Sequence, residues 1–392
     1  MKFLKLKELC TIKHGYAFNG KYITQQENNN ILVTPGNFKV GGGFKEDKCK
    51  YYNSKNIPKE YILNENDLIV TMTDLSKEAD TLGYSALIPQ KDKIYLHNQR
   101  IGLIKNINET IINKDYLYWY LRTRMYHNEI VATSTGTTVH HTSPERILNV
   151  KIPIYSLSIQ NKISKVLNII DNRIKINVQT NDNLYELSSS LYKKWYDSLS
   201  RDNITTLSKF DEMGKIVMGQ SPKGESYNYY NEGLPLINGA ADYENGFLKA
   251  QKYTTMPTKT CNKNDLIFCI RATIGLLTIC DKEYCLGRGV AGIVNINELY
   301  REYVFHLINN SIEPFKNLAT GSVIVGISKN DIQNIKVKIP SKEQIKNFHN
   351  IQKNLFDKME NIRQENIVLT QLRDTLLPKL MNGEIDLEKI EI

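Results

Sequence analysis

The apolar and polar positions of this chain follow two patterns, and each pattern occurs twice. Short apolar runs such as 68–70 and 266–268 alternate with turns rich in Gly, Asn, Asp and Pro, which predicts β-strands. Segments 158–199 and 341–381 instead carry an apolar residue every three or four positions, which predicts long helices. Shorter helices are expected at 114–130 and 298–311. The pattern predicts the order strand-rich domain, long helix, strand-rich domain, long helix.

The two strand-rich segments also share sequence. The tetrapeptide V-K-I-P occurs at 150–153 and again at 337–340. Upstream of it, "NENDLIVTM" (64–72) matches "NKNDLIFCI" (262–270), "HNQRIGLI" (97–104) matches "LGRGVAGIV" (286–294), and "TSTGTTV" (133–139) matches "LATGSVIV" (318–325). The order is preserved throughout, so duplication of one unit is the simplest explanation.

The long helical segments carry a heptad-like apolar stripe that is interrupted by asparagine. In the first segment, Asn177 and Asn181 fall within the stripe; in the second, the stripe includes Ile351, Asn366 and Leu372. Buried asparagine fixes the register of coiled coils, and a helix of about 40 residues spans roughly 60 Å. We expect the two helices to pair as an antiparallel coiled coil that spaces two domains related by a pseudo-twofold axis.

The predicted fold class is therefore α+β, with four segments. Residues 1–155 form the first domain and 156–200 the first long helix. Residues 201–340 form the second domain, and 341–392 form the second long helix with a C-terminal tail. The length of 392 residues accommodates two such domains, since single cores seldom exceed roughly 250 residues.

Composition narrows the class of partner. The net charge is +9, and most of the excess lies in residues 1–157, with 21 Lys and Arg against 15 Asp and Glu. This pattern fits a polyanion such as DNA, although a solvated surface explains an excess of this size equally well. No apolar run is long enough to span a membrane and no secretory signal opens the chain, so we expect a cytoplasmic protein.

Catalytic and metal-binding motifs are missing from the sequence. The six cysteines form no C-x-x-C pair and no histidines lie near them at ligand spacing, which predicts buried free thiols and no metal. No N-P-P-Y tetrapeptide, P-loop, or Gly-rich loop followed by an acidic residue occurs. Asp74, Glu78 and Asp80 are read as an acidic exposed loop rather than a nuclease site. The chain is predicted to be non-catalytic and to hold no cofactor.

Candidate DNA contacts lie in the turns of both domains. Arginine pairs with guanine and glutamine with adenine, and hydroxyls and histidine donate to phosphates or base edges. The predicted DNA-binding residues are Asn37, Lys39, Thr73, Gln99, Arg100, Ser134, Thr135, Thr137, Thr138, His140, His141, Lys223, Asn238, Arg271, Arg288, Thr320 and Ser322.

Several of these residues also have a purely structural interpretation. Loop 133–141 is also a plausible surface turn. Asn238 precedes Gly239, a pair that turn formation explains equally well. Arg271, whose counterpart is Thr73, suits either a base contact that differs between the halves or an internal ion pair.

Over nearly its whole length the chain resembles the specificity subunits of type I restriction-modification systems. The most specific match is the tail "QLRDTLLPKLMNGEIDLEKI" (371–390), and "LYKKWYDSL" (191–199) is similar to the end of the family's first helix. "GNFKVGGGF", "NENDLIVTM" and "HNQRIGLI" resemble segments of the family's target-recognition domains. The recurrence of N-Q-R in the family implies, as the alternative to a DNA contact, that Gln99, Arg100 and Arg288 hold a strand end by hydrogen bonds. The sequence departs from the family at "YSLSIQNKI", which lacks the P-x-x-E-Q that "PSKEQIKNF" retains.

This resemblance implies a non-catalytic reader of double-stranded DNA. Each target-recognition domain would contact one half of a split target, and the paired helices would set the gap and dock two methylation subunits. Those subunits would bring S-adenosylmethionine, and motor-nuclease restriction subunits would cleave. The alternative class is a duplicated coiled-coil scaffold or adaptor that reads no sequence; a self-sufficient DNA enzyme is disfavoured by the missing motifs.

Overall fold

The computed structural model describes residues 2–47, 49–90, 93–201, 204–244, 247–318 and 326–385. The chain divides into two compact units. The first unit comprises Met1–Ile176 together with Glu365–Ile392, and the second comprises Asn177–Gln364. Each unit thus combines a strand-rich domain with part of each long helix, and each is described by itself below.

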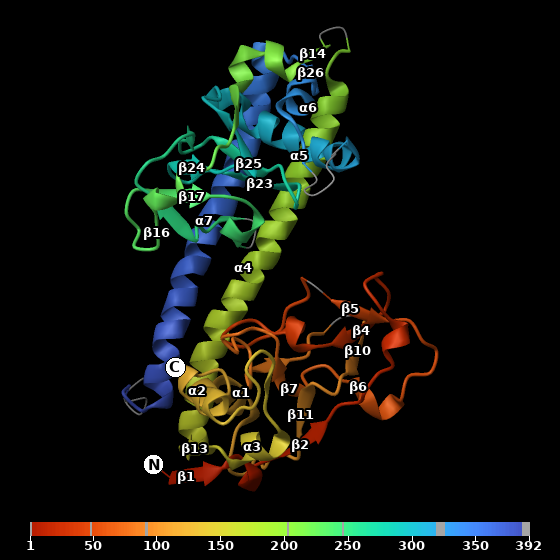
Figure 1. Ribbon diagram of the computed structural model, residues 1–392, viewed down its shortest axis with the longest axis vertical. Coiled ribbons are helices and arrows are strands. Elements are labelled where there is room, and N and C mark those ends of the chain that lie inside the picture. The colour runs from red at the N-terminus through yellow and green to blue at the C-terminus, as the bar shows by residue number, and fades with distance from the viewer. Residues whose placement is uncertain are drawn as a thin grey trace. The chain divides into compact units, whose positions relative to one another are not determined.

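The first unit contains two main sheets (Figure 1). A four-stranded antiparallel sheet has the order β2 (Thr11–His14), β11 (Ile101–Lys105), β7 (Leu68–Thr71), β9 (Ser85–Leu87). A five-stranded sheet has the order β3 (Ile23–Thr24), β5 (Lys50–Tyr52), β4 (Asn30–Val33), β10 (Ile94–His97), β6 (Ile62–Leu63). Within it, β4 and β10 pair in parallel, and the other pairs are antiparallel.

The second unit repeats both sheets in the same strand order. The four-stranded sheet runs β15 (Lys215–Met218), β25 (Val290–Val294), β22 (Leu266–Cys269), β23 (Gly275–Ile279). The five-stranded sheet runs β16 (Tyr227–Asn228), β20 (Lys252–Thr254), β17 (Leu234–Ile237), β24 (Tyr284–Leu286), β21 (Thr260–Cys261), with β17 and β24 parallel. A hairpin of β18 (Tyr243–Glu244) and β19 (Phe247–Leu248) is added. The predicted duplication is therefore confirmed at the level of topology.

The V-K-I-P segments close each domain. In the first unit, β13 (Lys151–Ile154) pairs antiparallel with the opening strand β1 (Lys2–Lys5). In the second, β26 (Lys336–Lys338) pairs in the same way with β14 (Ile204–Thr206). The tetrapeptide therefore joins the end of a domain to its beginning, directly before the chain enters a long helix.

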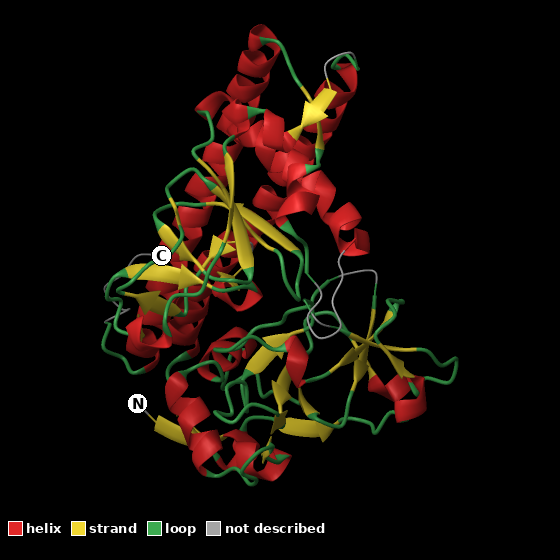
Figure 2. Cartoon of the chain, turned by 45° about the horizontal axis from the view of Figure 1, so that its top comes forward, coloured by secondary structure: helices red, strands yellow, loops and turns green. Residues whose placement is uncertain are grey.

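Helices pack on the four-stranded sheets, and Figure 2 shows helices, in red, beside strands, in yellow. The first unit has α1 (Lys114–Tyr120), α2 (Arg124–Ala132) and α3 (Pro144–Asn149), and the second has α5 (Arg301–Leu318) and α6 (Lys329–Gln333). Tyr116 and Trp119 of α1 are fully buried in one core with Leu68 and Val70 of β7. In the second unit, Tyr303 of α5 is buried with Leu266 and Phe268 of β22. Burial of such large side chains supplies most of the packing energy of these layers.

The two long helices are α4 (Leu157–Ser198) and α7 (Lys342–Met381), within one residue of the predicted 158–199 and 341–381. In the first unit, Arg373 of α7 donates to Asp171 of α4 at 2.8 Å, and Arg173 donates to Glu365 at 2.8 Å. Rising residue numbers on α4 meet falling numbers on α7, so the helices run antiparallel there.

The same antiparallel pairing is found in the second unit. The Asn181 side-chain amide donates to the Met359 carbonyl at 3.2 Å, and the Ser188 hydroxyl donates to Gln352 at 2.5 Å. Asn177 is buried, as the predicted register role requires. Two expected stripe residues on α7 differ from prediction: Ile351 and Leu372 are exposed, and the polar Gln352 is buried in place of Ile351 because it pairs with Ser188.

Candidate nucleic-acid interface

Backbone hydrogen bonds establish which residues of the two domains correspond. The Met72 amide donates to the Arg100 carbonyl at 2.9 Å, and the Ile270 amide donates to the Gly289 carbonyl at 2.9 Å. Thr73 therefore matches Arg271, and Gln99, the residue before Arg100, matches Arg288. Both correspondences agree with the sequence alignment, and they are fixed here by geometry independent of side chains.

A second pair of bonds extends the match to the loop after the helices. The Thr142 amide donates to the Met72 carbonyl at 3.0 Å, and the Ile327 amide donates to the Ile270 carbonyl at 3.1 Å. His141 accordingly matches Gly326. In the first domain Thr73 pairs with His141 across β8 (Thr73–Asp74) and β12 (His140–His141), and in the second Arg271 forms an isolated β-bridge with Gly326.

The second domain has a surface hollow of about 410 Å³ that contains three of the predicted residues, Asn238, Arg271 and Arg288. Ser221, Tyr227, Gly239, Ala240, Ala272, Thr273 and Gly289 complete its lining. No carboxylate lines it, and among the described residues neither arginine has an ion-pair partner. The internal ion pair that stood as the alternative for Arg271 is therefore absent from this part of the chain, and two exposed guanidinium groups face one site.

Glycines on both sides hold Arg288 in place. A Cβ on Gly287 would lie 2.1 Å from the side-chain oxygen of Asn238, and a Cβ on Gly289 would lie 1.9 Å from the Asn238 carbonyl oxygen. These contacts leave no room for larger residues, so the turn packs tightly against Asn238. The Arg288 side chain remains exposed, and its backbone amide donates to Ser221 Oγ at 3.4 Å.

Arg271 begins the turn between β22 and β23. The next residue, Ala272, has a positive φ of 58°, a conformation that non-glycine residues adopt only when their surroundings hold them. A Cβ on Gly326 would lie 3.2 Å from Arg271 Cγ, so the missing side chain of Gly326 leaves space for the arginine stem. Arg271 is thus exposed at its tip and supported along its stem.

The remaining predicted residues of the second domain are Asn238, Lys223, Thr320 and Ser322, and they do not resemble the two arginines in their placement. The Asn238 backbone amide donates to Asp242 at 2.7 Å, so the residue forms a turn and its side chain packs over Gly287. Lys223 is exposed, with Glu225 3.9 Å from its amine. Thr320 and Ser322 lie outside the described residues. Tyr227 lies in the Tyr-rich stretch 226–233, whose pattern favours packing at the core edge over stacking on bases. Ser221 and Thr273 were not predicted, because no pattern marks residues that meet only after the strands are assembled.

In the first domain, backbone atoms and Asn98 hold the strand end. The Gln99 amide donates to the Tyr16 carbonyl at 2.9 Å, and Asn98 Oδ1 accepts from the Arg100 amide at 3.0 Å. The Gln99 and Arg100 side chains are exposed. The strand end is therefore held by backbone atoms and the Asn98 side chain. The side chains of Gln99 and Arg100 do not hold it and are available to contact a partner.

Thr73 and His141 lie opposite each other on the paired strands β8 and β12 of the first domain. Thr73 is buried, and its hydroxyl lies 3.1 Å from His141 Nδ1. Because Thr73 is covered in this way, its predicted contact with DNA does not fit this placement. His141 itself is exposed.

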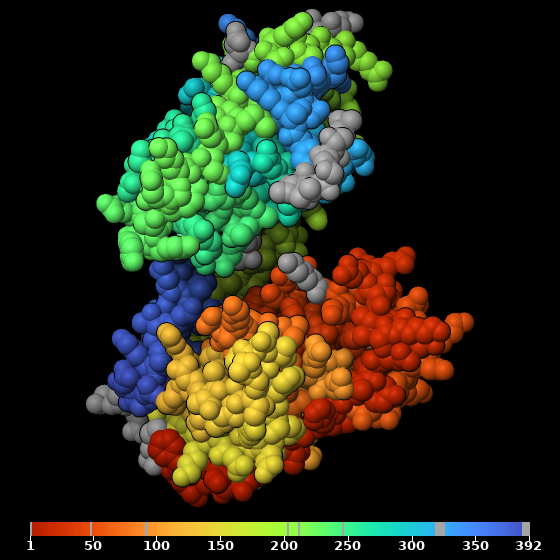
Figure 3. Space-filling model, in the orientation of Figure 1, coloured from red at the N-terminus to blue at the C-terminus, as the bar shows by residue number. Residues whose placement is uncertain are grey.

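The loop after α2 is mostly exposed. Thr135, Thr137 and Thr138 are exposed, and Figure 3 shows the surrounding segment of about residues 120 to 150, in yellow, at the surface of the first unit. Reciprocal backbone bonds between Thr135 and His141 close the loop. Ser134 donates its hydroxyl to the Val131 carbonyl at 2.8 Å, and His140 Nε2 lies 3.1 Å from the Lys77 carbonyl, so these two side chains are already engaged.

Of the two predicted residues Asn37 and Lys39, the first is buried and the second is exposed. Asn37 is fully buried; its Oδ1 accepts from the Thr34 amide at 2.9 Å and its amide donates to the Lys45 carbonyl at 3.2 Å. A DNA contact from Asn37 does not fit this burial. Lys39 is exposed at the surface, yet the pKa of its amine is lowered by partial desolvation and by the nearby cations Arg122 and Arg373, against the opposing effect of Asp171.

Asp74 corrects the expectation of an acidic exposed loop. It is buried, and its carboxylate accepts hydrogen bonds from the amides and hydroxyls of Ser76 and Thr81. Burial alone would raise the pKa of Asp74, but these four bonds outweigh it and hold the pKa below its ordinary value. Asp74 therefore organises the loop after β8 as an ionised group.

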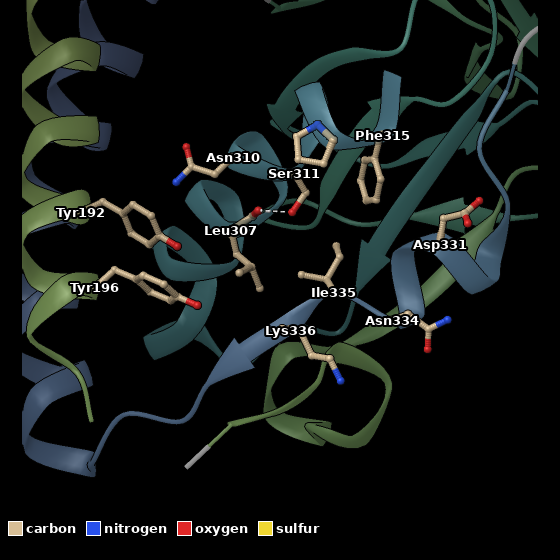
Figure 4. Close-up of a pocket in the computed structure, with 11 residues that line it drawn as sticks. Tyr192, Tyr196, Leu307, Asn310, Ser311, Phe315, Asp331, Asn334, Ile335 and Lys336 are labelled. Atoms are coloured by element: carbon tan, nitrogen blue, oxygen red, sulfur yellow. Dashed lines mark hydrogen bonds between the residues drawn. The ribbon is translucent and has the colours of Figure 1, made fainter. Parts of the chain in front are cut away.

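A second hollow of about 540 Å³ lies elsewhere in the second unit (Figure 4). Tyr192 and Tyr196 of α4 face Asn310, Ser311 and other residues of α5, and the Ser311 hydroxyl donates to the Leu307 carbonyl at 2.8 Å. Burial raises the pKa of Tyr192, so its phenol stays protonated at physiological pH. None of the predicted DNA-binding residues that the structure describes lines this hollow.

The described part of the chain holds no group of three or more His, Cys, Asp or Glu residues arranged to bind a metal ion. All six cysteines are free; Cys49 is half-buried and the other five are buried. No helix among the described residues has the length and apolar character that crossing a membrane requires.

Comparison with known proteins agrees with this architecture. The family model of the type I restriction modification DNA specificity domain matches twice, over residues 1–186 and 206–372. The chain is 28% identical over 323 residues to the "Putative type I restriction enzyme MjaX specificity subunit" of Methanocaldococcus jannaschii, covering 78% of this chain and 75% of the relative. It is 21% identical over 364 residues to the type I restriction enzyme HindI specificity subunit of Haemophilus influenzae, covering 71% and 79%.

A solved structure shares the fold. The S subunit of a type I restriction-modification system from M. genitalium superposes with a TM-score of 0.55 and 17% identity, covering 97% of this chain and 96% of that one. Two matches of one family model span most of the chain, and both domains carry the same strand order. The chain therefore belongs to the family of type I restriction-modification specificity subunits.

Proposed function

We propose that this specificity subunit reads a split sequence in double-stranded DNA, with each domain contacting one half. The observation that carries the proposal is the pair of domains with one strand order and different side chains at matching positions. Gln99 in the first domain corresponds to Arg288 in the second. In the bridged pair beside them, the exposed residue is His141 in the first domain and Arg271 in the second. A common scaffold with exchanged polar side chains is what two readers of different base sequences require.

The subunit supplies recognition, and the chemistry belongs to its partners. Two methylation subunits bring S-adenosylmethionine and methylate adenine, and motor-nuclease restriction subunits cleave. Support for docking comes from exposed apolar residues on the paired helices. Val368 is 62% exposed, and Ile367 and Leu372 on the same helix are also exposed. Val368 and Leu372 are four residues apart and therefore neighbours on the helix surface, and a contiguous exposed apolar patch marks an interaction site.

The docking role is tested by placing a charge on this surface. Val368→Glu should reduce capture of the methylation subunits because a carboxylate would be desolvated in the interface. Lys358→Glu, on an exposed face of the same helix, serves as the control. Equal capture by Val368→Glu and the unaltered subunit would show that the partners bind elsewhere.

The proposed function is tested by mapping N6-methyladenine. The gene would be expressed with its methylation-subunit gene in a host that lacks other adenine methylases. One split motif, absent when the specificity gene is omitted, is the expected result. Methylation without any sequence motif, from a complex that assembles, would instead indicate a scaffold that reads no bases.

A further inference from the structure

The hollow of the second domain presents two arginines at a fixed site. Arg271 and Arg288 come from different turns, yet the Ile270 amide donates to the Gly289 carbonyl at 2.9 Å and ties these turns together. Gly287 and Gly289 pack against Asn238, so the backbone around Arg288 has little freedom. Recognition of a base edge needs such a fixed backbone, because both hydrogen bonds of a guanidinium must align together.

The chemistry of the lining favours a hydrogen-bond acceptor as the ligand. It contains two guanidinium groups and no carboxylate, and neither arginine is paired among the described residues. Guanine offers two adjacent acceptors, O6 and N7, in the major groove, which match the fork of arginine. Adenine offers one acceptor and one donor there, which match the side-chain amide of glutamine.

We propose that Arg288 reads a guanine in the half-site of the second domain, and that Gln99 reads an adenine at the matching place in the first. This inference rests on the proposed function and assigns bases to it. Arg271 lies beside Arg288 in the hollow and supplies a further contact to the same half-site. Arg100 follows Gln99 by one residue, where the second domain has Gly289, so it is not the counterpart of Arg288.

The first experiment exchanges the two side chains. In the complex with the methylation subunits, Arg288→Gln should lower the preference for guanine at one position of the second half by roughly 10- to 100-fold. The other half should stay unchanged. Gln99→Arg should shift one adenine of the first half toward guanine. Lys223→Gln removes an equal charge from the same domain and should weaken binding to all sequences alike.

The second experiment alters atoms of the DNA and leaves the protein intact. Duplexes would carry 7-deazaguanine, which lacks N7, or inosine, which keeps O6 and N7, at each guanine of the second half. At one position 7-deazaguanine should reduce binding about tenfold, and inosine should bind nearly as well as guanine. In Arg288→Gln the effect of 7-deazaguanine should disappear, so an altered duplex stability is excluded as its cause.

Three results would overturn the assignment. A second half-site without a G·C pair would leave Arg288 no guanine to read. Uniform weakening by Arg288→Gln, like that of Lys223→Gln, would show a phosphate contact. A changed base in the wrong half would reverse the domain assignment. If the unaltered complex methylates no split motif at all, the proposed function fails, which is a separate outcome from failure of the base assignment.

Discussion

The bridged pairs Thr73–His141 and Arg271–Gly326 occupy one place in two copies of the same fold. In the first domain a small buried residue supports a large exposed imidazole from the opposite strand. In the second the large residue comes from the other side of the bridge, and glycine makes room for it. The backbone bonds around both pairs are the same. The two domains thus share the backbone arrangement here, whereas the exposed side chain at this place differs between them.

The helices of the two units also differ in how a carboxylate is paired. The largest effect on unfolding free energy is expected from breaking these contacts. In the second unit, Glu302 is buried between Arg301, at 2.6 Å, and His349, at 2.7 Å. In the first unit, Asp115 is half-buried and accepts from Asn168 at 2.8 Å. Glu302→Ala should cost about 3–5 kcal/mol of unfolding free energy, because it strands a buried cation. Asp115→Ala should cost about 1 kcal/mol.

Tryptophan fluorescence during urea unfolding measures both variants. Trp119 reports on the first unit and Trp195 on the second, and Trp→Phe changes at one or the other isolate each signal. Equal losses in Glu302→Ala and Asp115→Ala would show that the buried ion pair of Glu302 stabilises its unit no more than the half-buried hydrogen bond between Asn168 and Asp115 does.

Buried histidines should make both units sensitive to acid to a similar degree. Burial lowers the pKa of His97 in the first unit and of His306 in the second to about 4. The unfolded chain takes up protons below about pH 6.5, while the folded state keeps both rings neutral. Unfolding free energy should therefore fall as the pH drops from 6.5 to 4, by up to about 3 kcal/mol for each ring.

Urea unfolding at several pH values tests this slope. His97→Gln should flatten it for the Trp119 signal and His306→Gln for the Trp195 signal, whereas His14→Gln, at an exposed position, should leave both unchanged. A stability that is constant between pH 6.5 and 4 would show that these rings accept protons in the folded state.

Gly289 has no glycine counterpart in the first domain, where Arg100 stands in its place. Gly289→Ala places a Cβ 1.9 Å from the Asn238 carbonyl oxygen, so the turn that carries Arg288 must shift. We expect a loss of about 1–3 kcal/mol in the second unit and weaker recognition of the second half only. Gly224→Ala is the matched control, because nothing lies within 4 Å of its added Cβ. Unaltered methylation of the second half in Gly289→Ala would show that this packing does not position Arg288.

The smallest change in stability is expected from transplanting one bridged pair. Arg271→Thr combined with Gly326→His gives the second domain the pair of the first. Arg271 is exposed and Gly326 is half-buried, and the arginine stem that a Cβ at position 326 would meet is removed in the same variant, so unfolding free energy should change by less than about 1 kcal/mol. The methylated motif should change within its second half, by roughly tenfold at one base pair. A motif that stays the same would mean that this position does not contact bases.

The sequence predicted the elements and their repetition well because these depend on local patterns. Apolar periodicity located α4 and α7 to within one residue, and the apolar runs 68–70 and 266–268 lie in strands β7 and β22. Burial of individual polar residues was harder to predict. Asn37 and Thr73 are buried because distant residues, Lys45 and His141, supply their hydrogen-bond partners. The hollow around Arg271 and Arg288 arises only when Ser221, Tyr227 and the segments 238–240, 271–273 and 288–289 meet, and no spacing along the chain encodes that.

The most direct test of two independent readers is an exchange of one domain. Residues 1–155 contain both β1 and β13, so the segment keeps its closing strand pair when it is replaced by that of a relative with a mapped split target. N6-methyladenine in cells carrying the hybrid subunit and its methylation subunits would then be mapped. If each domain reads its own half, one half of the motif should become that of the relative and the other half should stay unchanged. A hybrid that alters both halves would show that the domains do not read independently.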